Sequence, residues 1–213
     1  MQIQVALDRI SLEQAIGIAR ATALHVDWVE MGTSLIKQYG LAGLQALVAA
    51  ADPTPVLADL KAVDDVRFEF ALAFDGGARS ATVLGLAPQV SLETAVQVCQ
   101  ERGRELVVDL MGMSQEQIAQ KAAMLPASVV LAPHVSKDAQ SSQQRPTDLL
   151  GPWANGRRLA LAGGLTAADL PGLRDWPDLR VIVGSAITTA DDPVAAVREL
   201  RRAAGKDTDE HAC

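Results

Sequence analysis

The feature that most constrains this chain is a regular alternation of short apolar runs with longer amphipathic segments. Runs such as 55–59 (PVLAD) and 180–184 (RVIVG) have the length and β-branched content of buried strands. Segments such as 11–24 carry apolar residues at spacings of three and four, which is typical of a helix buried on one face. Strands that alternate with helices form a parallel sheet. Eight such units predict a (β/α)8 barrel, with a doubly wound open sheet as the alternative.

Each of the eight expected strands is followed by an expected helix. The strands are residues 3–7, 26–31, 55–59, 80–85, 105–110, 128–132, 158–163 and 180–184. The helices with the clearest pattern are residues 11–24, 91–103, 114–125 and 192–205. In the second of these, Ser91 is a start signal and Gly103 is a stop signal.

The chain of 213 residues is long enough for one sizeable core and has no linker that would divide it. We therefore expect a single catalytic domain over residues 1–205 and a disordered tail over residues 206–213. Aromatic residues make up only 3% of the chain, so aliphatic side chains must fill the core. The two cysteines, Cys99 and Cys213, are placed so that no structural disulfide is expected, which favours a reducing compartment.

Charge and hydropathy exclude several classes of function. The net charge of −7 and the pI near 4.9 oppose binding to nucleic acid or to an acidic membrane surface. The first residues, MQIQVALD, lead directly into a strand, and no run of 18 or more apolar residues occurs. The expected protein is soluble and cytoplasmic, with neither nucleic acid nor membrane as its partner.

Ionisable residues stand where five of the eight expected strands end. They are Asp8, Glu30, Asp59 with Lys61, Asp109 and His134. A (β/α)8 barrel builds its active site from the carboxyl ends of its strands. An aspartate there can also cap the following helix, and this alternative holds for any one of them. Glutamate is a poor cap by type and lysine caps nothing, so the set as a whole favours an active site.

Asp59, Lys61 and Asp64 lie close enough together in the sequence that we expect their opposite charges to meet in one mouth of the barrel. Lys61, between Asp59 and Asp64, is expected to keep its proton and to stabilise a developing oxyanion. Glu30 and Asp59, from neighbouring strands, form a reasonable pair of ligands for Mg²⁺, which takes one or two protein carboxylates. The alternative is that these acids only pair with Lys61.

The last two strands end in glycine-rich loops. Gly163 and Gly164 follow the seventh strand, and Gly184 with Ser185 follows the eighth. These two loops of a barrel frequently bind phosphate, and glycine lets backbone N–H groups approach it. A small phosphorylated metabolite is therefore the expected substrate. His134 has a structural alternative, but its position at a strand mouth favours proton abstraction.

Several motifs along the chain together resemble a known family. They are VALD, VEMGT, ADLKAVD, TVLG, VVDLMG, the histidine of PHVSKDAQ, LAGGL and VIVGSAIT..ADDP, and they cover about residues 2 to 202. In this order they are similar to the 3-hexulose-6-phosphate synthase family of the orotidine-5′-monophosphate decarboxylase suprafamily. The D-x-K-x-x-D signature, here Asp59, Lys61 and Asp64, is the most specific of them.

The resemblance implies a Mg²⁺-dependent homodimer with paired active sites that forms a 1,2-enediolate on a sugar phosphate and adds it to formaldehyde. It implies that Glu30 and Asp59 hold the metal, and that Lys61 stabilises or protonates the intermediate. His134 is then the base, while Asp8 and Asp109 line the sugar pocket. Asp64 reaches the partner subunit's site. Gly164, Gly184 and Ser185, with the neighbouring Gly163, bind the phosphate.

Two other functions remain as alternatives at this point. The related 3-keto-L-gulonate-6-phosphate decarboxylase is favoured by Lys137, which is similar to a basic residue of that enzyme. Against it, Asp109 stands where the decarboxylase pattern has glutamate, and Ala-Gly-Gly and Gly-Ser-Ala replace its Thr-Gly-Gly and Gly-Arg-Ser. A barrel that binds a sugar phosphate without turnover is the third reading, because the segments at Asp65–Val66 and 135–146 depart from the family pattern.

Overall fold

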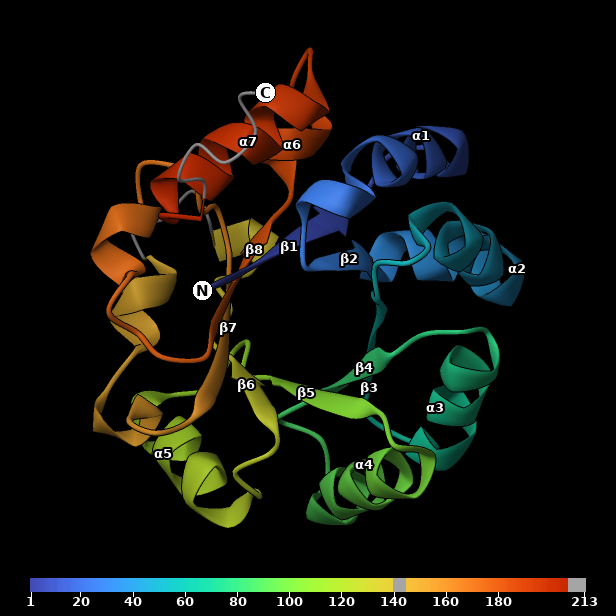
Figure 1. Cartoon of the computed structure of the whole chain (residues 1–213). Helices are drawn as coiled ribbons and strands as arrows, with labels where there is room; N and C mark the ends of the chain where they lie inside the picture. Colours follow the sequence, from blue (N-terminus) through green and yellow to red (C-terminus); the bar gives the residue numbers. More distant parts are fainter. Residues whose placement is uncertain (140–144, 207–213) are drawn as a thin grey trace.

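Eight parallel strands close into a barrel in sequence order (Figure 1). The computed structural model describes residues 1–139 and 145–206. The strands are β1 (Gln2–Leu7), β2 (Trp28–Met31), β3 (Val56–Ala62), β4 (Ser80–Leu84), β5 (Glu105–Asp109), β6 (Val130–Ala132), β7 (Arg158–Ala162) and β8 (Leu179–Val183). Val5 of β1 is in register with both Val29 of β2 and Val183 of β8. This closure confirms the barrel and makes the open sheet wrong.

Helices surround the barrel as an outer ring (Figure 1). They are α1 (Leu12–Thr22), α2 (Thr33–Ala51), α3 (Val66–Asp75), α4 (Gln89–Arg102), α5 (Gln115–Met124), α6 (Ser185–Thr188) and α7 (Pro193–Ala203). Ser11 and Ser114 each accept a hydrogen bond from a backbone N–H in the first turn of the helix that follows. The side chain of the glutamine three residues later accepts a hydrogen bond from the serine backbone N–H, which completes a capping box. The start expected at Ser91 is wrong, because α4 begins two residues earlier, after Pro88.

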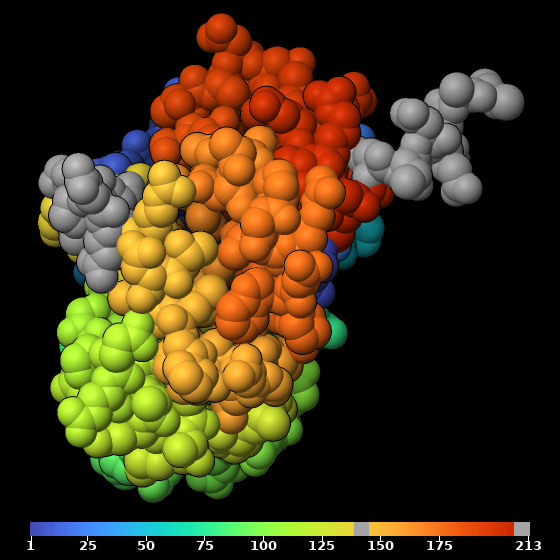
Figure 2. All heavy atoms as spheres, turned by 90° about the vertical axis from the view of Figure 1, so that its left-hand side faces the viewer, coloured from blue at the N-terminus to red at the C-terminus, as the bar shows by residue number. Residues whose placement is uncertain are grey.

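The expectation that every strand is followed by an α-helix is wrong after β6 and β7. In the described residues these connections hold only 3-10 turns, at Lys137–Ala139, Pro146–Leu149, Pro152–Ala154 and Leu170–Leu173. Three of the four turns contain a proline at their first or second position, and proline cannot donate the backbone hydrogen bond that an α-helix needs. Figure 2 shows this yellow-to-orange part of the chain as a continuous surface between α5 below and the red C-terminal helices above.

The strands bury side chains on both faces, as closure of a parallel sheet requires. Outward-facing residues such as Ile3, Leu7 and Leu161 belong to the large core between the sheet and the helices. A smaller cluster fills the barrel itself. It consists of Leu57, Val107, Val130, Ala132 and Ala160, with Trp28 and Ile182 packed against it. This layer makes the barrel a packed core rather than a channel.

The ends of the described chain and its cysteines also bear on the sequence expectations. Lys206, the last described residue, forms an ion pair with Asp27 at 2.6 Å. The rest of the expected tail, including Cys213, lies outside the described residues. Cys99 is a free thiol, and burial followed by the charge of Glu105 raises its pKa to about 12. Across residues 1–139 and 145–206 there is no helix both long and apolar enough to span a membrane.

We predict opposite effects for two glycine-to-alanine substitutions. Gly103 ends α4 with a φ of 59°, and an added Cβ would meet no atom within 4 Å there. Gly103→Ala should therefore lower the free energy of unfolding by about 1 kcal/mol, from backbone conformation alone. Gly17, inside α1, also has open space, and Gly17→Ala should raise the same quantity by roughly 0.5–1 kcal/mol. Urea unfolding measures both, and a stabilising Gly103→Ala would contradict the left-handed helix end.

Candidate active site

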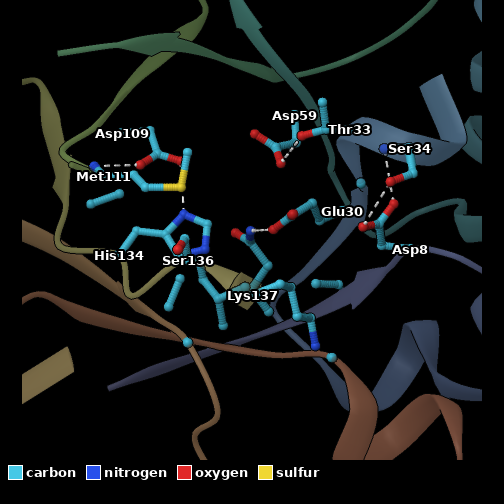
Figure 3. A pocket seen from close by; sticks show the side chains of 18 of the residues that line it. Asp8, Glu30, Thr33, Ser34, Asp59, Asp109, Met111, His134, Ser136 and Lys137 are labelled. Carbon is cyan, nitrogen blue, oxygen red and sulfur yellow. Dashed lines mark hydrogen bonds and ion pairs between the residues drawn. The ribbon is translucent and has the colours of Figure 1, made fainter. Parts of the chain in front are cut away.

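A cavity of about 580 Å³ opens at the carboxyl ends of the strands (Figure 3). Residues from β1 through the loops after β7 and β8 line it. Ten of the eleven residues selected from the sequence are among them: Asp8, Glu30, Asp59, Lys61, Asp109, His134, Gly163, Gly164, Gly184 and Ser185. The structure therefore places these strand ends and loops around one cavity, while the roles of the residues stay predictions.

Lys61 lies between two buried carboxylates. Its Nζ atom contacts Asp59 Oδ2 and lies 3.2 Å from Asp109 Oδ2. Burial alone would lower the pKa of Lys61, but the charges of Asp59 and Asp109 outweigh it and hold the pKa above its ordinary range. The ammonium group therefore keeps its proton and acts as a donor of hydrogen bonds to negative charge, not as a base.

The second carboxylate partner of Lys61 is not the one expected from the sequence. Asp64 is exposed, does not line the cavity, and accepts a hydrogen bond from the backbone N–H of Asp65. The expectation that Asp64 shares one mouth with Lys61 is wrong within one chain. The physical reason is that β3 ends at Ala62 and Asp65 adopts a left-handed conformation (φ 46°), so that Asp64 lies beyond the strand in the turn before α3.

An irregularity in β3 places Lys61. The register against β4 shifts between Ala58 and Ala62, and Lys61 has a φ of 49°. Such a conformation is costly for a residue with a Cβ atom, so the surroundings must hold it. Thr82 of β4 does this, because its Oγ1 accepts a hydrogen bond from the Lys61 backbone N–H at 2.8 Å.

Two threonines fix the carboxylate of Asp59. Thr82 Oγ1 donates to Asp59 Oδ1 at 2.8 Å, and Thr33 Oγ1 donates to Asp59 Oδ2 at 2.7 Å. Both threonines line the cavity, and the sequence reasoning missed both. The available signal for Thr82 was a hydroxyl residue near the carboxyl end of a mostly apolar strand. Thr33 follows its strand in the motif VEMGT, and nothing in its type alone distinguished it.

Asp109 connects Lys61 to His134. Asp109 Oδ2 lies 2.9 Å from His134 Nδ1, and Asp109 Oδ1 accepts from the Met111 backbone N–H at 2.9 Å. Burial would raise the pKa of Asp109, but the hydrogen bond and charge of His134 and then the charge of Lys61 lower it. Burial would lower the pKa of His134, and its hydrogen bond and attraction to Asp109 raise it. With Nδ1 engaged, His134 can exchange a proton with a substrate through Nε2.

Glu30 lies at the inner end of the cavity, buried beside Asp59. Its Oε2 atom accepts a hydrogen bond from Nε2 of Gln4, a residue that the sequence reasoning also missed. Burial and then the charge of Asp59 raise the pKa of Glu30 to about 8. The two carboxylates therefore repel each other, and a cation placed between them would relieve that repulsion.

Asp8 combines the two interpretations that the sequence left open. Its Oδ1 accepts hydrogen bonds from the backbone N–H groups of Ser34, at 2.9 Å, and Leu35, at 3.3 Å, in the first turn of α2. It is therefore a cap, although it caps the helix after the next strand rather than its own. The same side chain lines the cavity beside Ser34 (Figure 3).

Both glycine-rich loops line the cavity. Gly163 has a φ of 116°, and a Cβ atom there would stand 2.7 Å from the carbonyl oxygen of Val135, so only glycine fits. Gly184 precedes the short helix α6, which begins at Ser185. Thr166 and Asp169 follow Gly163 in a turn and not in an α-helix, and Asp169 Oδ2 accepts a hydrogen bond from Thr166 N at 2.8 Å.

Comparison with known proteins defines the class to which this barrel belongs. Residues 1–200 match the model of the orotidine 5′-phosphate decarboxylase / HUMPS family. The chain is 36% identical over 208 residues to a 3-hexulose-6-phosphate synthase of Mycobacterium gastri, a match that covers 95% of this chain and 99% of the relative. It is 34% identical over 208 residues to a protein of the same name from Staphylococcus epidermidis, covering 95% and 98%.

Solved structures agree with these relatives. A 3-hexulose-6-phosphate synthase from Salmonella typhimurium superposes with a TM-score of 0.88 at 30% identity, covering 97% of this chain and 99% of that one. KGPDC from Streptococcus mutans superposes with a TM-score of 0.82 at 25% identity, covering 96% and 97%. The chain belongs to the orotidine 5′-phosphate decarboxylase / HUMPS family. Within it, the chain is an enzyme of the carbon–carbon lyase class.

We predict that Thr82 supports both the site and the fold. Thr82→Val keeps the shape of the side chain but removes the hydroxyl that bonds to the Lys61 N–H and to Asp59 Oδ1. The free energy of unfolding should fall by about 1–3 kcal/mol and turnover by at least about tenfold. Ser80→Ala is the matched control, because Ser80 Oγ is buried on the same strand with no hydrogen-bond partner among the described residues. Urea unfolding and steady-state assays of both variants make the test, and equal effects would contradict it.

Proposed function

We propose that this enzyme is a 3-hexulose-6-phosphate synthase, which condenses formaldehyde with D-ribulose 5-phosphate. The observation that carries the proposal is the chain of contacts Asp59–Lys61–Asp109–His134, which sets a protonated amine and an oriented imidazole against one cavity. Proton abstraction next to a carbonyl is catalysed by a base together with positive charge near the developing oxyanion, and these two groups can supply both. The names of the similar proteins from Mycobacterium gastri and Staphylococcus epidermidis support the same assignment.

The residues divide the reaction as follows. Backbone N–H groups of the loops at Gly164 and Gly184 bind the phosphate, and Asp8 and Asp109 contact the sugar hydroxyls. His134 Nε2 takes a proton from C1 of ribulose 5-phosphate, and the Lys61 ammonium stabilises the resulting 1,2-enediolate. C1 then attacks the carbon of formaldehyde and forms the new C–C bond. The proton taken by His134 returns to the former aldehyde oxygen, so the step needs no further reactant.

The donor set also fits Mg²⁺, held by Glu30 and Asp59. These are two buried carboxylates on adjacent strands, and burial, followed by the charge of Asp59, raises the pKa of Glu30. In the described part of the chain, no three His, Cys, Asp or Glu side chains form a complete metal cage. Mg²⁺ does not need such a cage, because one or two protein carboxylates are enough when waters and substrate oxygens supply its other ligands. Bound there, the ion would supply Lewis-acid stabilisation of negative charge on the substrate.

A second candidate is the decarboxylase reaction on 3-keto-L-gulonate 6-phosphate. Lys137 favours it, because this exposed cation lines the same cavity just beyond His134. A cation at that position could hold a substrate carboxylate. The decarboxylase reaches the same enediolate by loss of CO₂, so Lys61 would have the same role. Only the substrate that the protein turns over therefore distinguishes the two reactions.

The enzyme is also proposed to be a homodimer in which Asp64 serves the partner's cavity. Asp64 is outside its own cavity, and apolar side chains are exposed beside it in the sequence, on α3, and before and on the neighbouring α4. They include Val63 before α3, Phe68 and Leu72 on α3, Leu86 before α4, and Val90 in the first turn of α4. A second copy of the chain would cover this surface and would bring its own Asp64 with it.

Formaldehyde consumption by the purified protein tests the reaction. With ribulose 5-phosphate and Mg²⁺ the protein should consume formaldehyde, and EDTA or omission of the sugar phosphate should stop it. Lys61→Ala should lower turnover by about 10²–10³ because the enediolate loses its fixed charge. Near-normal turnover in that variant, with an unchanged circular dichroism spectrum, would remove the proposed role of Lys61. No consumption by folded, Mg²⁺-loaded protein, with CO₂ released from 3-keto-L-gulonate 6-phosphate, would establish the decarboxylase instead.

We predict that Phe68→Glu separates the dimer. Phe68 is 59% exposed on α3, and a charge at this position would be buried without a partner in the dimer. Sedimentation velocity should show a dimer for the unchanged protein and a monomer for the variant. Leu24→Glu is the control, because Leu24 is 77% exposed in the turn that leads into β2, at the opposite end of the barrel. If Phe68→Glu stays dimeric, the interface lies elsewhere on the protein. If the unchanged protein is monomeric, the proposed dimer is excluded.

A further inference from the structure

Beneath the apolar layer of the barrel lies a buried ionic cluster centred on Arg180. This residue of β8 is buried, and its Nη2 donates to both carboxylate oxygens of Glu105, at 2.9 and 3.0 Å. Its Nε donates to Gln2 Oε1 at 3.2 Å, and its guanidinium lies 4.1 Å from the centre of the Trp28 ring. Arg158 forms a second ion pair with Glu105, with 3.0 Å between its Nη2 and Glu105 Oε2. The guanidinium of Arg180 is therefore fixed on several sides.

One side chain connects this cluster to the active site. Gln4 of β1 is fully buried, and its Oε1 accepts a hydrogen bond from Arg180 Nη1 at 3.2 Å. Its Nε2 donates to Glu30 Oε2. Arginine has only donors, so the oxygen of the amide has to face Arg180 and the NH₂ group has to face Glu30. Arg180 thus determines which end of Gln4 is presented to the cavity.

We infer that Arg180 and Gln4 position the carboxylate of Glu30 for cation binding, an inference that rests on the proposed Mg²⁺ site. The hydrogen bond from Gln4 restrains Oε2 and so fixes the plane of the carboxylate. Ligands of metal ions are commonly oriented in this way by a neighbour that does not touch the metal. Gln4 and Arg180 are positioning residues, since neither is a candidate ligand.

The burial of Gln4 is difficult to explain by packing alone. It points into the barrel at the level where β1 is paired with Trp28 and Ile182, both of which pack against the apolar cluster. An aliphatic side chain would suit that layer, and a buried amide is costly unless both of its ends are bonded. Arg180 does not require Gln4 for its charge, because Glu105 balances it. The specific contribution of Gln4 is the link to Glu30.

Divalent-ion binding in the absence of substrate tests this inference. We use Mn²⁺ as the probe, measure free Mn²⁺ by electron paramagnetic resonance, and compare the unchanged protein with Gln4→Leu and Gln2→Leu. Gln4→Leu should bind Mn²⁺ about tenfold more weakly. Gln2→Leu removes a contact of the same Arg180 that does not reach Glu30, and should stay within about twofold. Gln4→Met, for which the same weakening is expected, is measured in parallel, so that the test can still be made if one of the two Gln4 variants misfolds.

The outcomes separate this inference from the proposed metal site. If the unchanged protein binds Mn²⁺, Glu30→Gln abolishes binding, and folded Gln4 variants bind normally, the positioning role is overturned. Equal weakening by Gln2→Leu and Gln4→Leu would also overturn it, because the effect would then be a general loosening of the cluster. If the unchanged protein binds no Mn²⁺, or Glu30→Gln has no effect, the metal site itself fails. For active variants, the Mg²⁺ concentration for half-maximal rate should rise about tenfold in Gln4→Leu with the KM for ribulose 5-phosphate unchanged.

Discussion

The site depends on the ion pairs that Lys61 makes with Asp59 and Asp109. A buried lysine would lose its proton and two buried aspartates would gain one, unless each compensates for the other. Here the three groups lie on β3 and β5, which flank β4 in the barrel, and this arrangement brings both carboxylates to one ammonium group. The same Asp109 holds His134, so the charge of the lysine and the orientation of the imidazole are determined together.

The interior of the barrel separates charge into two levels. An apolar layer that includes Leu57, Val107 and Ala160 lies between the catalytic groups at the carboxyl ends and the Arg180–Glu105 cluster nearer the amino ends. This layer supplies the dry surroundings that strengthen every polar contact near it. Gln4 crosses the layer, and its two hydrogen bonds join levels that would otherwise be independent.

Much of the fold and of the site follows from local pattern. The strands were predicted to within two or three residues at each end, and the glycine that ends α4 was recognised by type. His134 was found because it follows an apolar run. The helices expected after β6 and β7 were wrong, because prolines in three of the 3-10 turns interrupt the backbone hydrogen bonds of an α-helix. Thr33 and Gln4 were missed because an uncharged polar side chain carries little signal by itself.

The sequence by itself determined the alternation of eight strands with amphipathic segments, the set of ionisable residues at the strand ends and the two glycine loops, because strand period, residue type and strand ends are local properties. Only the tertiary structure decided which of these residues meet. Asp64 is three residues from Lys61 in the chain and lies outside the cavity, whereas Asp109 is in contact across β4. The reason is physical: closure of the sheet and the left-handed backbone of Lys61 set distances in space that separation along the chain does not contain.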